Sequence, residues 1–431
     1  MKRSYQIGAG VLLMMVGLPG VAPAQTPAST AGATSERCAN GARVLSGRCP
    51  AETFLLEVLA RDGVASAMAT LDELVASNED VRRDAHGFAH AIGIEAYTGA
   101  EEVGEVFSRC TPAYQSGCYH GVIQSYFGHQ IEHTGNGLDP SLINALCRTH
   151  REGNSSRWLL FQCAHGMGHG LVMVASGDLP GSLEGCDLVV EMWEREACYG
   201  GVFMENIVRA TLPHHTVGRP DAGTHQHGAA AEPMDPHDHG VAGAAGGQRE
   251  PFEPLRADEP LYPCSVLATR YNPACYQMQT SAILHFNGQD IPAAARVCTT
   301  APASYREICF QSLGRDVSAQ TGQDHERAIE LCRSAPPDYE PWCHIGYTKN
   351  LIDITADPAD GFAYCRILPP GQSKGFCYIA VGEQIWVLHE SEERREALCG
   401  VAETPYVEEC RYGAGLADDS PPPSVERLGA R

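Results

Sequence analysis

The sequence predicts an all-α protein, a solenoid of about nine two-helix repeats of roughly 33–39 residues, clipped together by local disulfides. Three observations predict this fold. The 18 cysteines fall into close couples, the couples recur at a fixed period, and helix-like segments alternate with loops that contain Pro and Gly. Hydrophobic residues make up 43% of the 431 residues, which is enough for most of the chain to fold.

The chain opens with the features of a secretory signal peptide. Lys2 and Arg3 form a basic region, residues 7–21 form an apolar stretch, and Ala22, Pro23 and Ala24 offer a cleavage site between small residues. We therefore expect residues 1–24 to be removed, residues 25–37 to form a flexible segment, and the mature protein to be periplasmic or secreted. No later stretch of ~18 apolar residues predicts a membrane span.

The cysteines form nine couples, and pairing within each couple is the default in an oxidising compartment. Members of a couple lie 8 to 16 residues apart, most often 11, and from Cys264 onward the first cysteines recur every 33 or 34 residues. Each small disulfide loop stabilises the fold by ~3 kcal/mol in the chain-entropy model. The predicted pairs are Cys38 with Cys49, Cys110 with Cys118, Cys147 with Cys163, Cys186 with Cys198, Cys264 with Cys275, Cys298 with Cys309, Cys332 with Cys343, Cys365 with Cys377, and Cys399 with Cys410.

Each repeat has a first helix that begins at the second cysteine of a couple and a second helix that ends at the next first cysteine. In one unit, the first helix starts at Cys309, a polar turn follows at residues 321–324, and the second helix covers residues 326–331 before Cys332. Pro, Gly, Ser and Asp between paired cysteines indicate a loop. A disulfide would then join the end of one helical hairpin to the start of the next.

Two intervals between successive cysteine couples are longer than this period. Between Cys49 and Cys110 there is room for one more unit without a couple, in which Asp84 stands where a helix-starting cysteine would be. The second interval contains residues 213–255, which are rich in Gly, Ala, Pro and His and predict a disordered insertion. The insertion separates N-terminal repeats at 38–212 from C-terminal repeats at 256–415, and residues 416–431 predict a disordered tail.

The first helices of several units open with Cys-x-x-Gly, as in Cys118–Gly121, Cys163–Gly166, Cys198–Gly201 and Cys343–Gly346. With two helices in units near 34 residues, residues 38–415 resemble in architecture the cysteine-rich tetratricopeptide-like repeat proteins that bacteria export. The resemblance implies an α-solenoid of a kind often used for binding, and it implies no particular activity.

Histidines recur in register when the first helices are aligned by their opening cysteine, or by Asp84 in the unit without one. The second position after this residue is His86, His120 and His165, and the sixth is His90, Gln124, His169 and Met204, followed by Glu205 and Asn206. Equivalent positions of a solenoid stack side by side, and residues four apart share one side of a helix. The five imidazoles are therefore expected to converge on one face.

Imidazole is a preferred ligand of copper, zinc and iron, so this face predicts a transition-metal site. The candidate ligands are His86, His90, His120, His165 and His169, with Gln124, Met204 and Asn206 in supporting positions and Glu205 as an additional ligand or a general base. Metal-assisted hydrolysis or oxidation would follow if the protein is an enzyme. The alternative is structural packing, although the units from Cys275 onward carry no histidine at these positions.

Other interpretations stay open. One is a non-catalytic envelope scaffold that binds a protein or peptidoglycan, and another is metal storage or delivery, which His214, His215, His225, His227, His237 and His239 of the insertion favour. His129 and His133 form a further candidate pair. The net charge of −22 suits cations and argues against nucleic acid, which needs clustered Lys and Arg.

Overall fold

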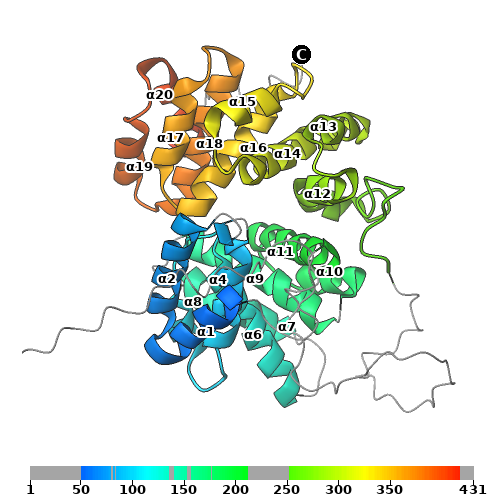
Figure 1. Cartoon of the computed structure of the whole chain (residues 1–431), viewed down its shortest axis with the longest axis vertical. Coiled ribbons are helices and arrows are strands. Elements are labelled where there is room, and N and C mark those ends of the chain that lie inside the picture. The colour runs from blue at the N-terminus through cyan, green and yellow to red at the C-terminus, as the bar shows by residue number, and fades with distance from the viewer. Residues whose placement is uncertain are drawn as a thin grey trace, which may run out of the picture.

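A computed structural model of the chain describes residues 50–78, 81–82, 84–134, 140–152, 157–175, 177–211 and 252–417. All regular elements of these residues are helices, which confirms the predicted all-α repeat fold (Figure 1). The signal segment, Cys38, Cys49, the insertion as far as residue 251 and the tail beyond residue 417 lie outside the described residues.

First and second helices alternate along the chain, and from α4 to α18 each first helix is longer than the second helix that follows it. The first helices are α1 (Pro50–Asp62), α4 (Ala85–Ala96), α6 (Gly117–Thr134), α9 (Arg157–Val174), α11 (Met192–Thr211), α12 (Asn272–Asn287), α14 (Arg306–Thr321), α16 (Glu340–Thr355), α18 (Gln372–Leu388) and α20 (Val407–Gly413). The second helices are α2 (Val64–Ser77), α5 (Val103–Phe107), α7 (Pro140–Leu146) with α8 (Arg148–Glu152), α10 (Leu179–Asp187), α13 (Ile291–Thr300), α15 (His325–Cys332), α17 (Pro358–Ile367) and α19 (Glu392–Cys399). Short 3-10 helices precede α12, α14 and α20: η3 (Thr269–Tyr271), η4 (Ala303–Tyr305) and η5 (Thr404–Tyr406).

Local chemistry explains where these helices begin. The side chains of Asp290, Asp324 and Ser391 accept hydrogen bonds from backbone N–H groups in the first turns of α13, α15 and α19. First helices begin before their cysteine rather than at it, as α14 does three residues ahead of Cys309. The reason is that the 3-10 helix η4 leads directly into α14, so the cysteine already lies in the helix.

Eight disulfides join cysteines of the described residues, and in each the two Cα atoms are 5.5–5.8 Å apart. All eight are predicted pairs: Cys110 with Cys118, Cys147 with Cys163, Cys186 with Cys198, Cys264 with Cys275, Cys298 with Cys309, Cys332 with Cys343, Cys365 with Cys377, and Cys399 with Cys410. Local spacing sufficed for this prediction because each disulfide joins the end of one hairpin to the next first helix. So many disulfides indicate an oxidising compartment outside the cytoplasm.

The last two disulfides show how the cysteines lie within the helices. Cys365 lies near the end of α17 and Cys377 in the second turn of α18, while Cys399 ends α19 and Cys410 lies inside α20. All four are fully buried. Cys377 and Cys410, like Cys309, were expected to open their helices, and each instead follows its helix start by three to five residues.

Glycines bring the first helices into backbone contact. At four junctions a Cβ on either glycine would lie only 1.8–2.1 Å from a carbonyl oxygen of the facing helix. The four pairs are Gly93 with Gly121 (α4 and α6), Gly168 with Gly201 (α9 and α11), Gly314 with Gly346 (α14 and α16), and Gly382 with Gly413 (α18 and α20). Because any larger side chain would prevent this approach, these glycines set the distance between neighbouring first helices.

The same contacts correct the predicted alignment of α4. Gly121 meets the backbone of His90, just as Gly201 meets the backbone of His165. His90 is therefore the equivalent of His165, and His86 lies one turn earlier than predicted. The alignment by Asp84 was wrong because Asp84 is the residue before α4, whereas Cys163 lies inside α9.

The array curves until its two halves meet. Helices α1–α11 form one half and α12–α20 the other, stacked below and above each other in Figure 1. The Arg157 guanidinium at the start of α9 lies 4.0 Å above the Trp386 ring of α18 and forms an ion pair with Glu390 at 2.8 Å. The backbone N–H of Tyr114 also donates to the carbonyl of Ile354, at 3.1 Å. First helices of both halves thus face one interior.

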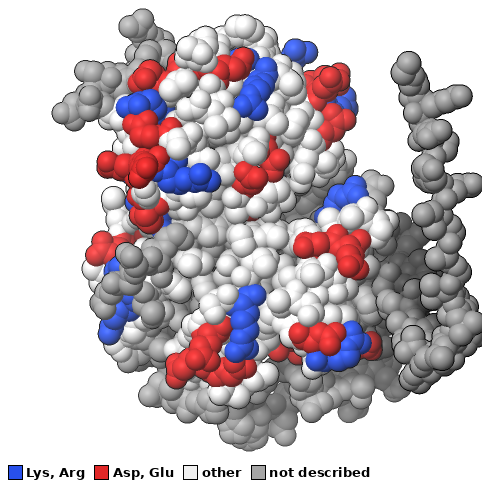
Figure 2. All heavy atoms as spheres, turned by 90° about the vertical axis from the view of Figure 1, so that its left-hand side faces the viewer, with Lys and Arg blue, Asp and Glu red and all other residues white. Residues whose placement is uncertain are grey.

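Acidic and basic side chains are interspersed over the face that Figure 2 shows, without a continuous basic surface there. Among the described residues, no helix combines the length and the apolar character needed to cross a membrane.

Candidate metal centre

The predicted histidine face lies inside the N-terminal half. His90 of α4, His120 of α6, and His165 and His169 of α9 are all buried, at 1–8% relative exposure. Their helices are successive first helices, and the glycine contacts between α4 and α6 hold two of the backbones together. Gly166 of α9 packs on Ile123 and on the Cα of His120. The glycines near the histidines therefore serve close packing of the helices.

The five imidazoles form one cluster. The ring centroids of His120, His165 and His169 lie 4.8–5.1 Å apart. His90 joins them at 5.4 Å from His169, and His86 at 5.6 Å from His120. One His86 nitrogen, Nδ1, lies 2.9 Å from the carbonyl oxygen of Tyr114. The expected convergence of these side chains is confirmed.

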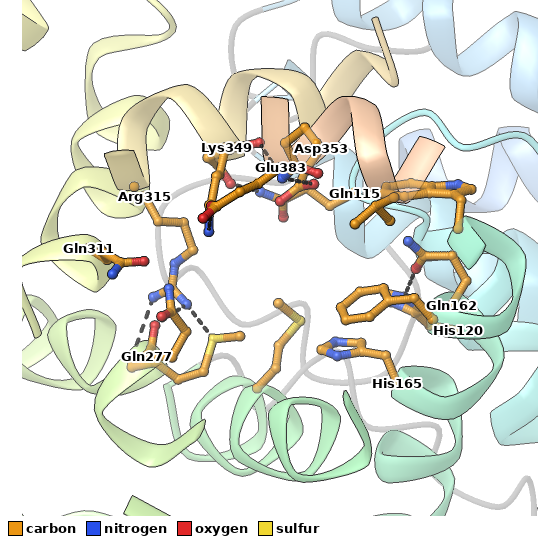
Figure 3. Close-up of a pocket in the computed structure, with 18 of the residues that line it drawn as sticks. Gln115, His120, Gln162, His165, Gln277, Gln311, Arg315, Lys349, Asp353 and Glu383 are labelled. Carbon is orange, nitrogen blue, oxygen red and sulfur yellow. Dashed lines mark hydrogen bonds and ion pairs between the residues drawn. The ribbon is translucent and has the colours of Figure 1, made fainter. Parts of the chain in front are cut away.

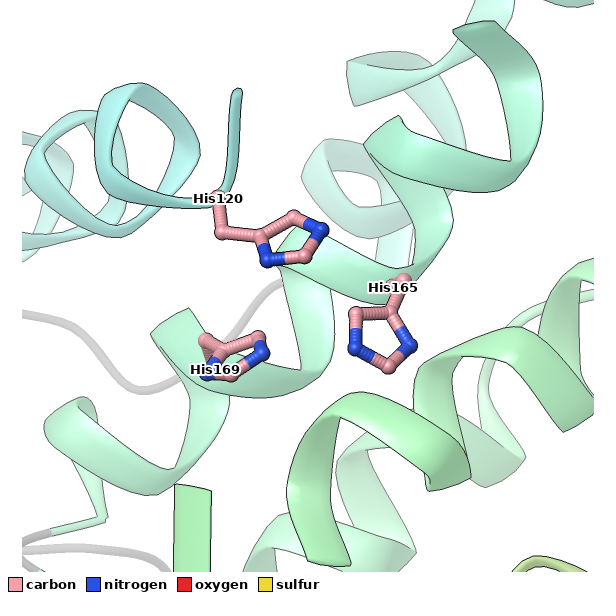
Figure 4. Close-up of side chains that lie close together, drawn as sticks. All are labelled: His120, His165 and His169. Carbon is pink, nitrogen blue, oxygen red and sulfur yellow. The ribbon is translucent and has the colours of Figure 1, made fainter. Parts of the chain in front are cut away.

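Three of the rings form a compact group that could hold an ion (Figure 4). His120, His165 and His169 each offer one nitrogen, and these atoms lie within 4.8 Å of one another. Each ring also has a buried nitrogen without a hydrogen-bond partner within the described part of the chain, namely His120 Nδ1, His165 Nδ1 and His169 Nε2. An unsatisfied buried polar atom costs ~1–3 kcal/mol, so three together need an explanation that a bound ion supplies.

The second nitrogens of two rings are held in place. His120 Nε2 lies 2.8 Å from Gln162 Oε1, and His169 Nδ1 lies 2.9 Å from Glu205 Oε2. Metal-binding histidines characteristically use one nitrogen for the metal and the other for a carboxylate or carbonyl oxygen, which fixes the tautomer and the ring orientation. Gln162 and Glu205 therefore act as positioning residues for this group.

A second group overlaps the first. His90, His169 and Glu205 offer ligand atoms that also lie within 4.8 Å of one another, and all three residues are buried. Glu205 thus lies where it could bind a metal, as one interpretation of the sequence expected. Its role as a general base stays a prediction.

Burial keeps the key imidazoles neutral. Removal from water lowers the pKa of His120 and His165 well below the usual range, and the neighbouring histidines lower it further through charge repulsion. A hydrogen bond with the backbone of Ala197 acts in the opposite direction on His165. Both rings are therefore in the neutral form that binds metals at physiological pH.

The remaining candidates differ in their contacts. Gln124 is buried and its Oε1 has no partner within the described residues. Met204 lines an adjacent cavity, while the Asn206 amide donates to the carbonyl oxygen of Pro254 at 3.1 Å and so connects α11 to the last residues of the insertion. His129 packs on the ring of Tyr97 instead of joining the cluster. The side chain of His133 and the six histidines of the insertion lie outside the described residues.

The adjacent cavity has a volume of about 360 Å³ and lies between the two halves (Figure 3). One side is formed by α9 and α11 with His120 and His165, and the other by α12, α14, α16 and α18. Burial raises the pKa of Asp353, on the far side, to about 7. The histidine group can thus be reached from a space large enough for a small molecule.

Sequence reasoning missed Gln162 and Asp353. Gln162 directly precedes Cys163, but nothing in its sequence context shows that its amide reaches His120 in a neighbouring unit. Asp353 joins the cavity only because the array closes on itself, so no local signal could have found it.

No protein-family model matches this chain, and neither a curated protein nor a solved structure is significantly similar to it. The resemblance to exported cysteine-rich tetratricopeptide-like proteins therefore stays a prediction.

Proposed function

We propose that this chain is an exported metalloprotein that binds one transition-metal ion through His120, His165 and His169. The observation that supports the proposal is the convergence of three buried imidazoles, each with a nitrogen that has no hydrogen-bond partner among the described residues. Three neutral imidazoles without a thiolate suit zinc, copper or iron. Zinc sites with three protein ligands are typically catalytic, because a fourth position is left to water or substrate.

We further propose metal-dependent hydrolysis as the activity. A bound metal would supply a Lewis acid and lower the pKa of water at the open position. Gln162 and Glu205 orient two ligand rings, and all three ligand histidines are buried in the protein. Asp353, whose pKa burial raises to about 7, provides the cavity with a carboxyl that exchanges a proton near neutral pH.

The test is elemental analysis of the full chain, expressed without a His-tag and purified from the periplasm. We expect about one metal ion per chain, lost in His165→Ala/His169→Ala and in the single variant His120→Asn. The matched control is His285→Ala, which removes an exposed histidine of α12 and should leave the metal content unchanged. Circular dichroism checks that each variant is folded.

Two outcomes would contradict the proposal: no stoichiometric metal in the wild type, or the same metal content in the folded cluster variants. Metal that disappears only when residues 213–251 are deleted would favour storage or delivery by the insertion. Stoichiometric metal without any hydrolytic activity would favour the second candidate, a binding scaffold, which the cavity between the halves supports.

A further inference from the structure

The cavity between the two halves extends well beyond the histidine group. Of the residues that line it, only His120 and His165 belong to that group, and most of the others come from the C-terminal half (Figure 3). Its volume of about 360 Å³ falls in the range of small-molecule sites. A metal ion alone does not account for this space.

The charged side chains of the cavity are already paired with each other or with their neighbours. The Arg315 guanidinium donates to Asp316 at 2.9 Å, to Ser281 at 2.6 Å and to the carbonyl oxygen of Gln277 at 3.1 Å. The Lys349 ammonium forms an ion pair with Glu383 at 2.6 Å. Because both cations are balanced, the cavity offers little net charge to attract an ionic ligand.

Amide side chains make up half of the polar residues in the lining. They are Gln115, Gln162, Gln277, Gln311, Asn350 and Gln384. Gln115 donates to Asn350 Oδ1 at 2.6 Å, while Asn350 Nδ2 is buried without a partner among the described residues. An amide both donates and accepts hydrogen bonds, as a hydroxyl group does. This lining therefore matches a ligand with several hydroxyl groups.

Aromatic rings form the wall next to the histidines. Trp158 and Phe161 of α9 line the cavity together with Trp193 of α11, and the Phe161 and Trp193 ring centroids are 5.9 Å apart. The Trp158 Nε1–H is buried and has no partner within the described residues. Such a wall combines apolar ring faces with one unsatisfied donor.

We propose that this cavity binds an uncharged saccharide of one or two pyranose rings. The C–H face of a sugar ring would lie on Trp158, Phe161 and Trp193, and its hydroxyl groups would pair with the amides, including Asn350 Nδ2. A flat aromatic compound would suit the wall but leave the buried amide unpaired, which costs binding free energy. This proposal rests on the proposed function in one respect, because the saccharide would lie beside the proposed metal group. Saccharide binding itself does not require the metal.

The test is titration of the full-length protein, followed by tryptophan fluorescence and isothermal calorimetry, with and without removal of metal by a chelator. The probes are maltose, cellobiose and di-N-acetylchitobiose, compared with benzoate as a flat anion. We expect at least one disaccharide to bind in both metal states with a Kd below a millimolar, and benzoate not to bind or compete.

Variants locate the site. Asn350→Ala and Trp158→Phe each remove one unsatisfied donor and should weaken saccharide binding by about tenfold, the effect of one lost hydrogen bond. The matched control is Trp342→Phe, which alters a tryptophan that packs on Phe376 and does not line the cavity. Binding that these two cavity variants leave unchanged would overturn the proposal.

The outcomes separate this proposal from the metal centre. Stoichiometric metal with no saccharide bound in either metal state would overturn the saccharide site and leave the metal centre standing. Saccharide binding by a protein that never contains metal would overturn the metal centre and leave the saccharide site standing. Benzoate binding that excludes the sugars would show that the cavity selects flat anions, contrary to this proposal.

Discussion

The geometry of the candidate metal site depends on the imidazoles and also on the residues that hydrogen-bond to them. A hydrogen bond to the second nitrogen of a metal-binding histidine fixes the tautomer and the orientation of the ring. Gln162 does this for His120, and Glu205 does it for His169. Both contacts join different repeat units, so the geometry of the group depends on how the units stack.

Removing the amide of Gln162 should loosen the site without abolishing it. We expect Gln162→Ala to weaken metal binding by about 10–100-fold, as is typical when a ligand histidine loses its supporting hydrogen bond, and to keep one ion per chain at saturating metal. Competition with a chromophoric chelator measures this affinity. Gln115→Ala is the control, since its amide contacts Asn350 and no histidine. Equal affinities for both variants would show that Gln162 does not position His120.

Asp353 should make stability depend on pH. Its carboxyl ionises near 3.8 in the unfolded chain but only at about 7 in the folded protein, so the free energy of unfolding falls as pH rises through this window. We therefore expect Asp353→Asn to match the wild type at pH 4 and to have the higher Tm at pH 8. Calorimetry of the metal-free proteins tests this, and the histidine contributions cancel in the difference. A Tm difference independent of pH would argue against a buried ionised carboxylate.

Among the helices, close backbone contact decides the arrangement. Reciprocal glycines join α4 to α6, α9 to α11, α14 to α16 and α18 to α20. Where one of the two facing positions carries a larger side chain, as Ile123 does opposite Gly166, the two helices pack through that side chain. The histidine group spans this junction of α6 and α9. It also includes residues of the two neighbouring junctions, α4 with α6 and α9 with α11, where glycines face each other.

Substitution of one contact glycine should separate two helices. A Cβ on Gly314 would lie 1.9 Å from the carbonyl oxygen of Cys343, so we expect Gly314→Ala to lower the free energy of unfolding by about 3 kcal/mol. Gly375 in α18 is the matched control, because its Cβ would meet nothing nearer than 3.8 Å. Gly375→Ala should instead stabilise the helix by up to ~1 kcal/mol. Thermal unfolding measures both, and similar effects would show that the backbone contact carries no such constraint.

The whole molecule depends on closure of the array. Residues about 230 positions apart meet where Arg157 lies on Trp386 and pairs with Glu390, and the ring of Trp193 lies 6.4 Å from that of Trp386. The cavity exists only because these contacts bring the two halves together.

Opening this contact should change the shape of the molecule but not its metal group. We expect Arg157→Ala to raise the radius of gyration in small-angle X-ray scattering and to weaken any ligand bound in the cavity. The metal content should remain, because His120, His165 and His169 all belong to the N-terminal half. Arg366→Ala is the control, since Arg366 stacks on Phe362 within one half. An unchanged radius of gyration would mean that other contacts suffice for closure.

Much of this protein could be predicted from the sequence because its organising signals are short-range. The eight described disulfides join cysteines 8 to 16 residues apart, and the starts of second helices such as α15 follow from capping residues nearby. The histidine face could be predicted because the cysteine period puts successive first helices in a common register.

The tertiary structure alone decided the rest. A unit without cysteines had no local marker of register, so only the contact of Gly121 with His90 placed its histidines correctly. Gln162 and Asp353 acquire their roles from neighbouring units and from the opposite half. The sequence by itself thus determined the repeat, its disulfides and the residues of one face, whereas helix packing and closure decided which nitrogens converge and where the cavity lies. Those depend on small rotations between units that accumulate along the array and are not encoded in any single repeat.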